Sequence, residues 1–435
     1  MTASPGRSLD DWLDHLEHLH PRGQAGIELG LERVRQVKAS LNQRQTCPVI
    51  TVGGTNGKGS TCALLEHTLL AAGYRIGVYS SPHLLRYNER VRINGMPAND
   101  ADFCTAFARV ESARGGVPLT YFEFGTLAAW EMFAAQSLPG QPGLDAIILE
   151  VGLGGRLDAT NVYDADCAIV TTIALDHMDY LGETREEIGC EKAGICRSRR
   201  PLICGDADPP QSLVDACRLA SADFLYLGRD FGSIRQEGQW QYWGSDGRKL
   251  GGLAFPSLRG EVQLHNASCA LAALNALRDR LPVTAQDIRR GLAEVEVAGR
   301  CQVVPGRPQI VLDVAHNPQA VAALAASLGG MGFARTTWAI FGMMADKDIA
   351  GVVESIKHRI DRWLPCDLPG PRAASAAELV KTLKKVGAGG TAEAFASPTA
   401  ALGFARDNAS DDDRILAFGS FLTVADVMRS LSLKA

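Results

Sequence analysis

A glycine-rich turn around a single lysine constrains this chain more than any other feature. The apolar run 49–52 leads into Gly-Gly-Thr-Asn-Gly-Lys-Gly-Ser at positions 53–60, and residues 61–67 have a helical pattern. Such a unit suits phosphate, because its backbone N–H groups turn inward while the helix start and the lysine add positive charge. A strand–turn–helix corner without a ligand is the alternative, but three glycines would weaken a plain turn.

The loop departs from the common P-loop template at two positions. That template has glycine five residues before the Gly-Lys pair, where this chain has Val52. It also has serine or threonine directly after the lysine, where this chain has Gly59, so that Ser60 comes one position late. A phosphate site is still expected here, formed by Thr55, Asn56, Gly57, Lys58, Gly59 and Ser60.

The bulk composition narrows the class of protein. The chain has 435 residues, a net charge of −5 and 46% hydrophobic residues, which predicts a globular protein of two or three domains. No basic surface for nucleic acid is indicated, and no apolar run is long enough for a membrane span. The 11 cysteines include no C-x-x-C pair, so we expect no zinc site and a reducing, cytoplasmic location. Buried thiols are expected at Cys47, Cys62, Cys167, Cys204 and Cys269.

The order of predicted elements indicates an α/β fold. Apolar segments at 49–52, 76–79, 146–150, 168–173 and 202–204 alternate with helical patterns, which is typical of a mostly parallel sheet with helices on both faces. Residues 229–255 have short polar–aromatic runs that predict an antiparallel excursion. The acidic run 411–413 is interpreted as a solvated surface turn.

A second, smaller Rossmann-like α/β domain is predicted after a turn-rich connector. The connector is placed at 298–308, where glycines and prolines are frequent, and strands are expected at 310–314, 338–341 and 415–418. The predicted domains are therefore 1–297, which carries the phosphate loop, and 309–435.

Polar side chains follow three further strands of the predicted first sheet. Ser81 comes after 76–79, Glu150 ends 146–150, and His177 comes after 168–173. Ligands of doubly wound sheets bind at the carboxyl ends of the strands, and oxygen donors with a neutral imidazole suit Mg²⁺ beside a nucleotide phosphate. Taken singly, Ser81 could cap a helix, Glu150 could be an ion-pair partner and His177 could be a core histidine.

The motifs resemble those of the Mur-ligase superfamily along essentially the whole chain. The string 54–60 resembles its ATP loop, and the Lys-Gly-Ser ending resembles the folate branch, the folylpolyglutamate synthases. Further matches are Ser-Ser-Pro-His at 80–83, Glu-Val-Gly-Leu-Gly-Gly-Arg at 150–156, Asp-Val-Ala-His-Asn-Pro at 313–318 and Gly-Ser-Phe at 419–421. The likeness is greatest to the bifunctional dihydrofolate synthase/folylpolyglutamate synthases.

The resemblance implies roles for individual residues. Ser81, Glu150 and His177 would ligate Mg²⁺, in a site of two ions, and residues 55–58 would hold the ATP phosphates, with Ser60 adding a metal contact. The family also implies ATP contacts for Asn266, Arg300 and Asp313, with His316 beside nucleotide or glutamate, and Arg300 near a hinge.

Lys192 matches a lysine that is carbamylated in the family. A bare ammonium would repel two divalent ions, whereas a carbamate on the same side chain is an anionic metal bridge. The resemblance therefore implies catalytic importance for Lys58, His177 and Lys192. The alternative for Lys192 is a surface lysine paired with Glu187 or Glu191.

A pterin-binding site is implied by likeness to three segments of the bifunctional enzymes. An aromatic pair with a carboxylate suits a flat, hydrogen-bonding ring, although Tyr121 and Phe122 would by spacing alone be core residues. The implied set is Gly26, Ile27, Glu28, Leu29, Thr120, Tyr121, Phe122, Glu123, Leu157, Asp158 and Ala159.

The resemblance implies an ATP-dependent ligase that adds L-glutamate to dihydropteroate and to reduced folates through an acyl phosphate. Its partners would be small molecules, with no nucleic acid and no membrane, and the family suggests a monomer. Two alternatives remain: a muramyl-peptide ligase of the same superfamily, which Gly59 and the segment 120–123 disfavour, and a non-catalytic nucleotide-binding regulator.

Overall fold

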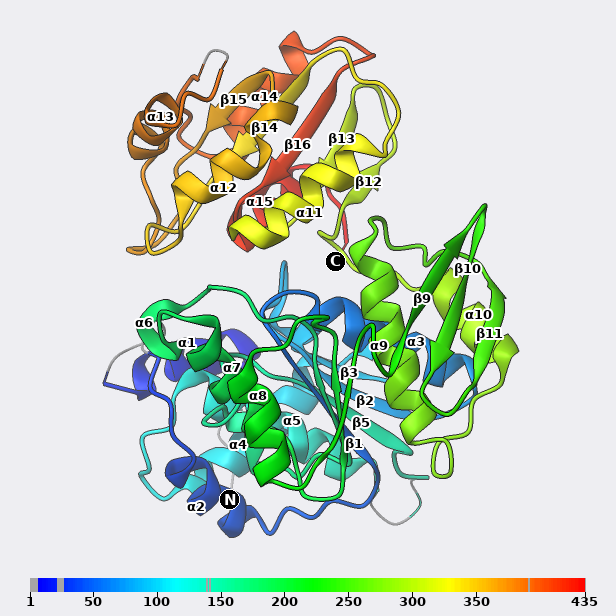
Figure 1. The fold of residues 1–435 in the computed structure, drawn as a ribbon. Coiled ribbons are helices and arrows are strands. Elements are labelled where there is room, and N and C mark those ends of the chain that lie inside the picture. Colours follow the sequence, from blue (N-terminus) through cyan, green and yellow to red (C-terminus); the bar gives the residue numbers. More distant parts are fainter. Residues whose placement is uncertain (1–6, 22–26, 138–139, 141, 390–391, 435) are drawn as a thin grey trace. The chain divides into compact units, whose positions relative to one another are not determined.

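The computed structural model describes residues 7–21, 27–137, 140, 142–389 and 392–434, and it divides into two compact units (Figure 1). Unit 1 comprises Met1–Phe255 and His265–Val295, and unit 2 comprises Pro256–Leu264 and Glu296–Ala435. In the part of the chain that is described, no helix combines the length and the apolar character that a membrane crossing needs.

Unit 1 is built on an eight-stranded sheet with the order β4-β3-β2-β5-β1-β6-β7-β8. The strands from β2 to β8 in this order are parallel, and β3 and β4 extend one edge in antiparallel fashion. The order of β2, β5, β1 and β6 brings four carboxyl ends side by side. The strands are β1 (Val49–Gly53), β2 (Ile76–Tyr79), β3 (Val91–Ile93), β4 (Met96–Pro97), β5 (Ala146–Glu150), β6 (Cys167–Val170), β7 (Pro201–Cys204) and β8 (Asp223–Tyr226).

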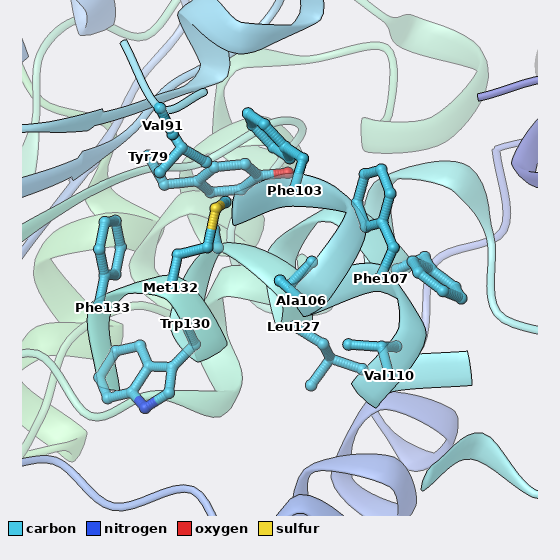
Figure 2. Packing of buried hydrophobic residues seen from close by; sticks show 14 of the residues in the cluster. Tyr79, Val91, Phe103, Ala106, Phe107, Val110, Leu127, Trp130, Met132 and Phe133 are labelled. Atoms are coloured by element: carbon cyan, nitrogen blue, oxygen red, sulfur yellow. The ribbon is translucent and has the colours of Figure 1, made fainter. Parts of the chain in front are cut away.

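Helices cover both faces of this sheet, as predicted (Figure 1). Four helices, α1, α2, α4 and α5, enclose an aromatic-rich core with Ile147 and Leu149 of β5, part of which is drawn in Figure 2. Helix α3 packs on β1, β2 and β5 and on α10. The helices are α1 (Leu9–Leu19), α2 (Glu32–Leu41), α3 (Lys58–Ala71), α4 (Asp100–Arg114), α5 (Tyr121–Ala135), α6 (Met178–Leu181), α7 (Arg185–Ala193), α8 (Gln211–Leu219), α9 (Val262–Ala276) and α10 (Ala285–Glu294).

The predicted antiparallel excursion is confirmed as a separate three-stranded sheet of β9 (Phe231–Gln236), β10 (Gln239–Gly244) and β11 (Lys249–Leu253). Helix α5 begins at Tyr121. The side chain of Thr120 accepts from the backbone N–H of Glu123, and the Glu123 carboxylate accepts from the N–H of Thr120, so the first turn is capped.

Unit 2 contains a five-stranded sheet with the order β12-β13-β16-β14-β15, in which β12 alone is antiparallel to its neighbour. The strands are β12 (Gln302–Val304), β13 (Gln309–Leu312), β14 (Thr337–Phe341), β15 (Arg362–Pro365) and β16 (Arg414–Phe418). The helices are α11 (Pro318–Gly329), α12 (Ile349–Ile356), α13 (Ala376–Lys385), α14 (Pro398–Asn408) and α15 (Phe421–Ser430).

Two details of unit 2 differ from the sequence interpretation. The segment 298–308, expected as a connector, contains β12 and lies within unit 2, because β12 pairs with β13 across a Pro-Gly turn. Asp413 is buried, since its carboxylate accepts from Trp338 Nε1 (3.1 Å) and from the N–H of Ser410 (2.9 Å). Only Asp411 and Asp412 of the acidic run are solvated.

Candidate active site

The glycine-rich loop connects β1 to α3 in unit 1, as its sequence predicts. Gly57 adopts a left-handed conformation (φ 91°) directly before the first residue of α3, Lys58. Lys58 Nζ donates to the backbone carbonyls of Gly54 and Thr55, both at 3.1 Å. The ammonium is therefore folded back over the loop, at the positive end of a helix, where phosphate binds.

The loop is fastened to the residues that follow β6. The N–H of Asn56 donates to Thr172 Oγ1 (3.0 Å), and Thr171 Oγ1 donates to the carbonyl of Asn56 (2.6 Å). Thr55 Oγ1 donates to the carbonyl of Ala174 at 3.2 Å. Hydrogen bonds thus hold the phosphate loop against the segment that leads from β6 to His177.

Asn266 of α9 lies directly against this loop. A Cβ atom placed on Gly57 would come within 2.5 Å of Asn266 Oδ1, so the absence of a side chain at Gly57 is what lets the amide approach. Asn266 is 3% exposed. The structure therefore brings this predicted nucleotide contact to the phosphate loop, although the two lie far apart in sequence.

The three predicted metal ligands follow neighbouring strands. Glu150, at the end of β5, is 4% exposed, and its Oε2 accepts from the N–H of Ser81, after β2, at 3.1 Å. His177 lies after β6 in a left-handed conformation (φ 53°), with Nε2 4.0 Å from Asp176 Oδ1. Ser81 and Glu150 therefore meet directly.

Lys192, in the last turn of α7, is 2% exposed, which rules out the surface-lysine alternative. Burial and, to a smaller extent, the positive charge of Lys58 lower the pKa of Lys192 to about 7, and Asp176 opposes the change. The two glutamates weighed as partners are engaged elsewhere, Glu187 with Thr184 and Glu191 with Arg156. The buried amine of Lys192 therefore lies within electrostatic range of Lys58 and Asp176.

The chemistry of the three predicted metal ligands can be compared with what Mg²⁺ requires. No group of three or more His, Cys, Asp or Glu side chains able to hold a metal occurs within the described ranges. The predicted set has one carboxylate, one imidazole and one hydroxyl. Mg²⁺ is commonly held by one or two carboxylates together with nucleotide phosphates and water, so these residues fit it beside the phosphate loop.

Two of the predicted pterin segments, those of Glu28 and Glu123, come together around Arg33, which sequence reasoning missed. Its guanidinium donates to both oxygens of Glu123, at 3.0 and 3.2 Å, and also to Glu28. Phe122 lies against Gly152 of the 150–156 motif, since a Cβ there would be 2.6 Å from its ring. The ring of Tyr121 contacts that of Tyr87 edge-on, with 5.8 Å between the ring centres. Gly26 lies outside the described residues.

Asp158 has a structural task in addition to any ligand contact. Its Oδ2 accepts from the N–H of Leu153 (3.0 Å), and its Oδ1 accepts from both donors of Thr160. Burial raises the pKa of Asp158, and these hydrogen bonds oppose the change. Leu157 is partly exposed and Ala159 buried, on either side of this aspartate.

In unit 2, two predicted nucleotide or glutamate contacts, Arg300 and His316, lie against Phe421, and Asp313 interacts electrostatically with both. The guanidinium of Arg300 lies 5.4 Å from the ring centre of Phe421, and the imidazole of His316 lies 6.2 Å from it. Asp313 accepts from the N–H groups of Cys301 and Ala315. Burial raises the pKa of Asp313, and the charge of Arg300 opposes this.

Comparison with known proteins identifies the family. Residues 299–421 match the Mur ligase, glutamate ligase domain model. The chain is 44% identical to dihydrofolate synthase/folylpolyglutamate synthase of Escherichia coli K12, over 98% of this chain and 95% of that one, and 40% identical to the Haemophilus influenzae enzyme, over 96% of each. The E. coli FolC structure with DHPP and ADP superimposes with a TM-score of 0.91, 43% identity and 99% coverage of both chains.

The chain belongs to the dihydrofolate synthase/folylpolyglutamate synthase family. It is therefore an ATP-dependent ligase of the Mur-ligase type, which adds glutamate in dihydrofolate synthesis and folylpolyglutamylation. The muramyl-peptide ligase and regulator alternatives are not favoured by these relatives. A structure of the Yersinia pestis enzyme holds AMPPNP and a manganese ion, with a TM-score of 0.89, 44% identity and coverage of 99% of this chain and 100% of that one.

Membership of the dihydrofolate synthase/folylpolyglutamate synthase family does not by itself assign residues. The residues of the phosphate loop and Ser81, Glu150, His177 and Lys192 all belong to unit 1, whereas Arg300, Asp313 and His316 belong to unit 2. Thr171, Thr172 and Arg33 could have been found from sequence only by asking what holds the motif residues in place.

Proposed function

We propose that this chain activates the carboxyl group of a pterin or folate substrate as an acyl phosphate at the carboxyl ends of β2, β5, β1 and β6. A carboxylate is a poor electrophile, so the γ-phosphoryl group of ATP passes to it first and ADP forms. The amine of L-glutamate then attacks, and phosphate leaves from a tetrahedral intermediate. The direct contact of Ser81 with Glu150, beside the loop that carries Lys58, is the observation that carries this assignment.

Lys58 and the first N–H groups of α3 provide positive charge for the transferring phosphoryl group. Charge stabilisation and positioning supply most of the catalysis in phosphoryl transfer, because the protein contributes little covalent chemistry. Mg²⁺, held by Ser81, Glu150 and His177, supplies further positive charge beside the phosphates when it is bound. The manganese and AMPPNP of the Y. pestis structure support this choice of cofactors.

Lys192 is proposed to carry a carbamate. Its lowered pKa leaves a large neutral fraction at neutral pH, and a neutral amine combines with carbon dioxide to form a carbamate and release one proton. The product would replace a buried positive charge, close to that of Lys58, by a negative one. This removes a repulsion that the structure contains and creates an anionic ligand for a second metal ion.

The pterin is proposed to bind between the segments that Arg33 holds together. Phe122 and Tyr121 offer ring faces, and Glu28, Glu123 and Asp158 offer carboxylates, as expected for a flat heterocycle. DHPP is bound in a structure of the E. coli relative, and L-glutamate is bound in a structure of a bifunctional folylpolyglutamate synthase/dihydrofolate synthase, which supports these substrates. Cytoplasmic location and a monomeric state remain predictions.

The activity is tested by phosphate release with Mg-ATP and glutamate, run in parallel with dihydropteroate and with tetrahydrofolate. Release that requires glutamate and occurs with each acceptor is the expected result. A UDP-muramyl acceptor serves as the control and should give background release. Release with the muramyl acceptor alone would refute the proposal.

A further inference from the structure

An ion pair outside the predicted site residues joins α3 to β3. Arg92 of β3 donates from Nε to Glu66 Oε1 and Oε2, at 3.1 and 3.0 Å, and from Nη2 to Oε2 at 2.7 Å. Glu66 belongs to α3, the helix that begins at Lys58, and its side chain is 2% exposed. A buried carboxylate is costly unless it is paired, so the ion pair between Glu66 and Arg92 is needed for the fold.

The remaining nitrogen of Arg92 reaches the loop that carries Ser81. Its Nη1 donates to Ser80 Oγ at 3.2 Å and to the carbonyl of Glu89 at 3.3 Å. The side chain of Glu89 in turn accepts from the N–H groups of Leu84 and Leu85, at 2.7 and 2.8 Å. One guanidinium therefore holds both ends of the segment 80–89.

The positive charge of Arg92 interacts with Glu66 and with Glu150, the carboxylate at the end of β5. Burial works against its charged form, but Glu66, with Glu150 as a smaller contributor, raises the pKa of Arg92 above its ordinary value. The guanidinium thus stays charged beside the carboxylate that is predicted to ligate the metal. Lysine could keep this charge, but it could not reproduce the planar set of donors.

We propose that Arg92 is a positioning residue that holds the Ser81 loop against the phosphate-loop helix and so presets the metal site. The inference rests on the proposed metal ligands, because Arg92 touches Ser80 and Glu89 rather than the metal. Partners that orient metal ligands typically contribute 10- to 100-fold to metal affinity, so the effect of losing this clamp should be large.

Arg75 offers a matched control, because it lies just before β2, the strand that pairs with β3. Its Nε and Nη2 donate to both oxygens of Asp145, which precedes β5, at 3.2 and 3.0 Å. Arg75→Lys and Arg92→Lys therefore each weaken one Arg–carboxylate pair of the same sheet. Only the second lies beside the proposed metal site.

The experiment measures the Mg²⁺ concentration for half-maximal activity and the Kd for ADP without metal. Arg92→Lys should raise the Mg²⁺ constant roughly tenfold while the ADP constant changes less than about twofold. Arg75→Lys should leave both constants unchanged. An unchanged Mg²⁺ constant in Arg92→Lys, or an equal rise in both constants, would overturn the inference.

Two further variants distinguish the positioning role of Arg92 from the proposed metal site itself. Ser80→Ala removes one acceptor of Arg92 and keeps the ion pair with Glu66, so it remains informative if Arg92→Lys fails to fold. A rise in the Mg²⁺ constant of Ser80→Ala would support the positioning role of Arg92, and an unchanged constant would contradict it. Glu150→Gln tests the metal ligand itself. An unchanged Mg²⁺ constant in that variant would refute the proposed metal site, whatever Arg92 does.

Discussion

Lys58, at the start of α3, and Lys192, in the last turn of α7, lie close enough that the charge of Lys58 lowers the pKa of Lys192. Two lysines near each other, one of them buried, are unfavourable in a protein without ligands. The arrangement is understandable if phosphate neutralises the first and a carbamate replaces the charge of the second.

The carbamate can be observed directly. Protein equilibrated with ¹³C-labelled bicarbonate should show a carbamate resonance that is absent from Lys192→Ala. Because only the unprotonated amine reacts, the signal should grow as the pH rises through about 7. A spectrum without this resonance at pH 8.5 would remove the carbamate from the account.

Lys192 should also lower the stability of carbonate-free protein. Its folded pKa, about 7, lies below the ordinary 10.5, so between these values the unfolded chain binds the extra proton and stability rises with pH. Replacement by methionine should therefore raise the free energy of unfolding by about 1–4 kcal/mol below pH 7, and by progressively less toward pH 10.5, while activity is lost. Denaturant unfolding at several pH values measures this, with exposed Lys381→Met as a control that should show no such trend.

Lys58→Ala should reduce synthesis by at least roughly 10²-fold, because a preorganised charge at the transferring group is removed. The fold should survive, since Lys58 Nζ bonds only to carbonyls of its own loop among the described contacts. Steady-state kinetics and circular dichroism check the two parts. Turnover at the wild-type rate would refute the role of this lysine.

A pair of glycine substitutions tests the contact of Asn266 with the phosphate loop. Gly57→Ala places a methyl group 2.5 Å from Asn266 Oδ1, whereas Gly73→Ala, also at a positive φ, meets nothing within 4 Å. Both should lose about 1 kcal/mol of stability from the backbone, but only Gly57→Ala should abolish ADP binding in calorimetry. Equal ADP affinity in the two variants would contradict the contact.

The sequence predicted the alternation of strands and helices, and the strand ends, because buried apolar runs and glycine turns are local signals. It could not predict that Asn266 reaches Gly57 or that Lys192 approaches Lys58, because these contacts depend on helix packing. The burial of Asp413 was not predicted for the same reason, because its partner, Trp338, lies on β14, far away in sequence.

Some site residues came from resemblance and not from pattern. By spacing alone Tyr121 and Phe122 would be core residues, and the structure shows both in aromatic contacts that serve packing as well. The capping of α5 by Thr120 and Glu123 is a recognisable sequence signal, and it explains why the helix begins at Tyr121.

The proposed mechanism depends on a divalent ion that Ser81, Glu150 and His177 hold beside the phosphate loop. A crystal of this protein grown with Mn²⁺ and AMPPNP, measured at the manganese absorption edge, tests it most directly. We predict an anomalous peak within about 2.5 Å of Ser81 Oγ, a Glu150 oxygen and a His177 nitrogen. A peak elsewhere, with nucleotide bound in the loop at Lys58 and these three side chains distant from any ion, would contradict the account.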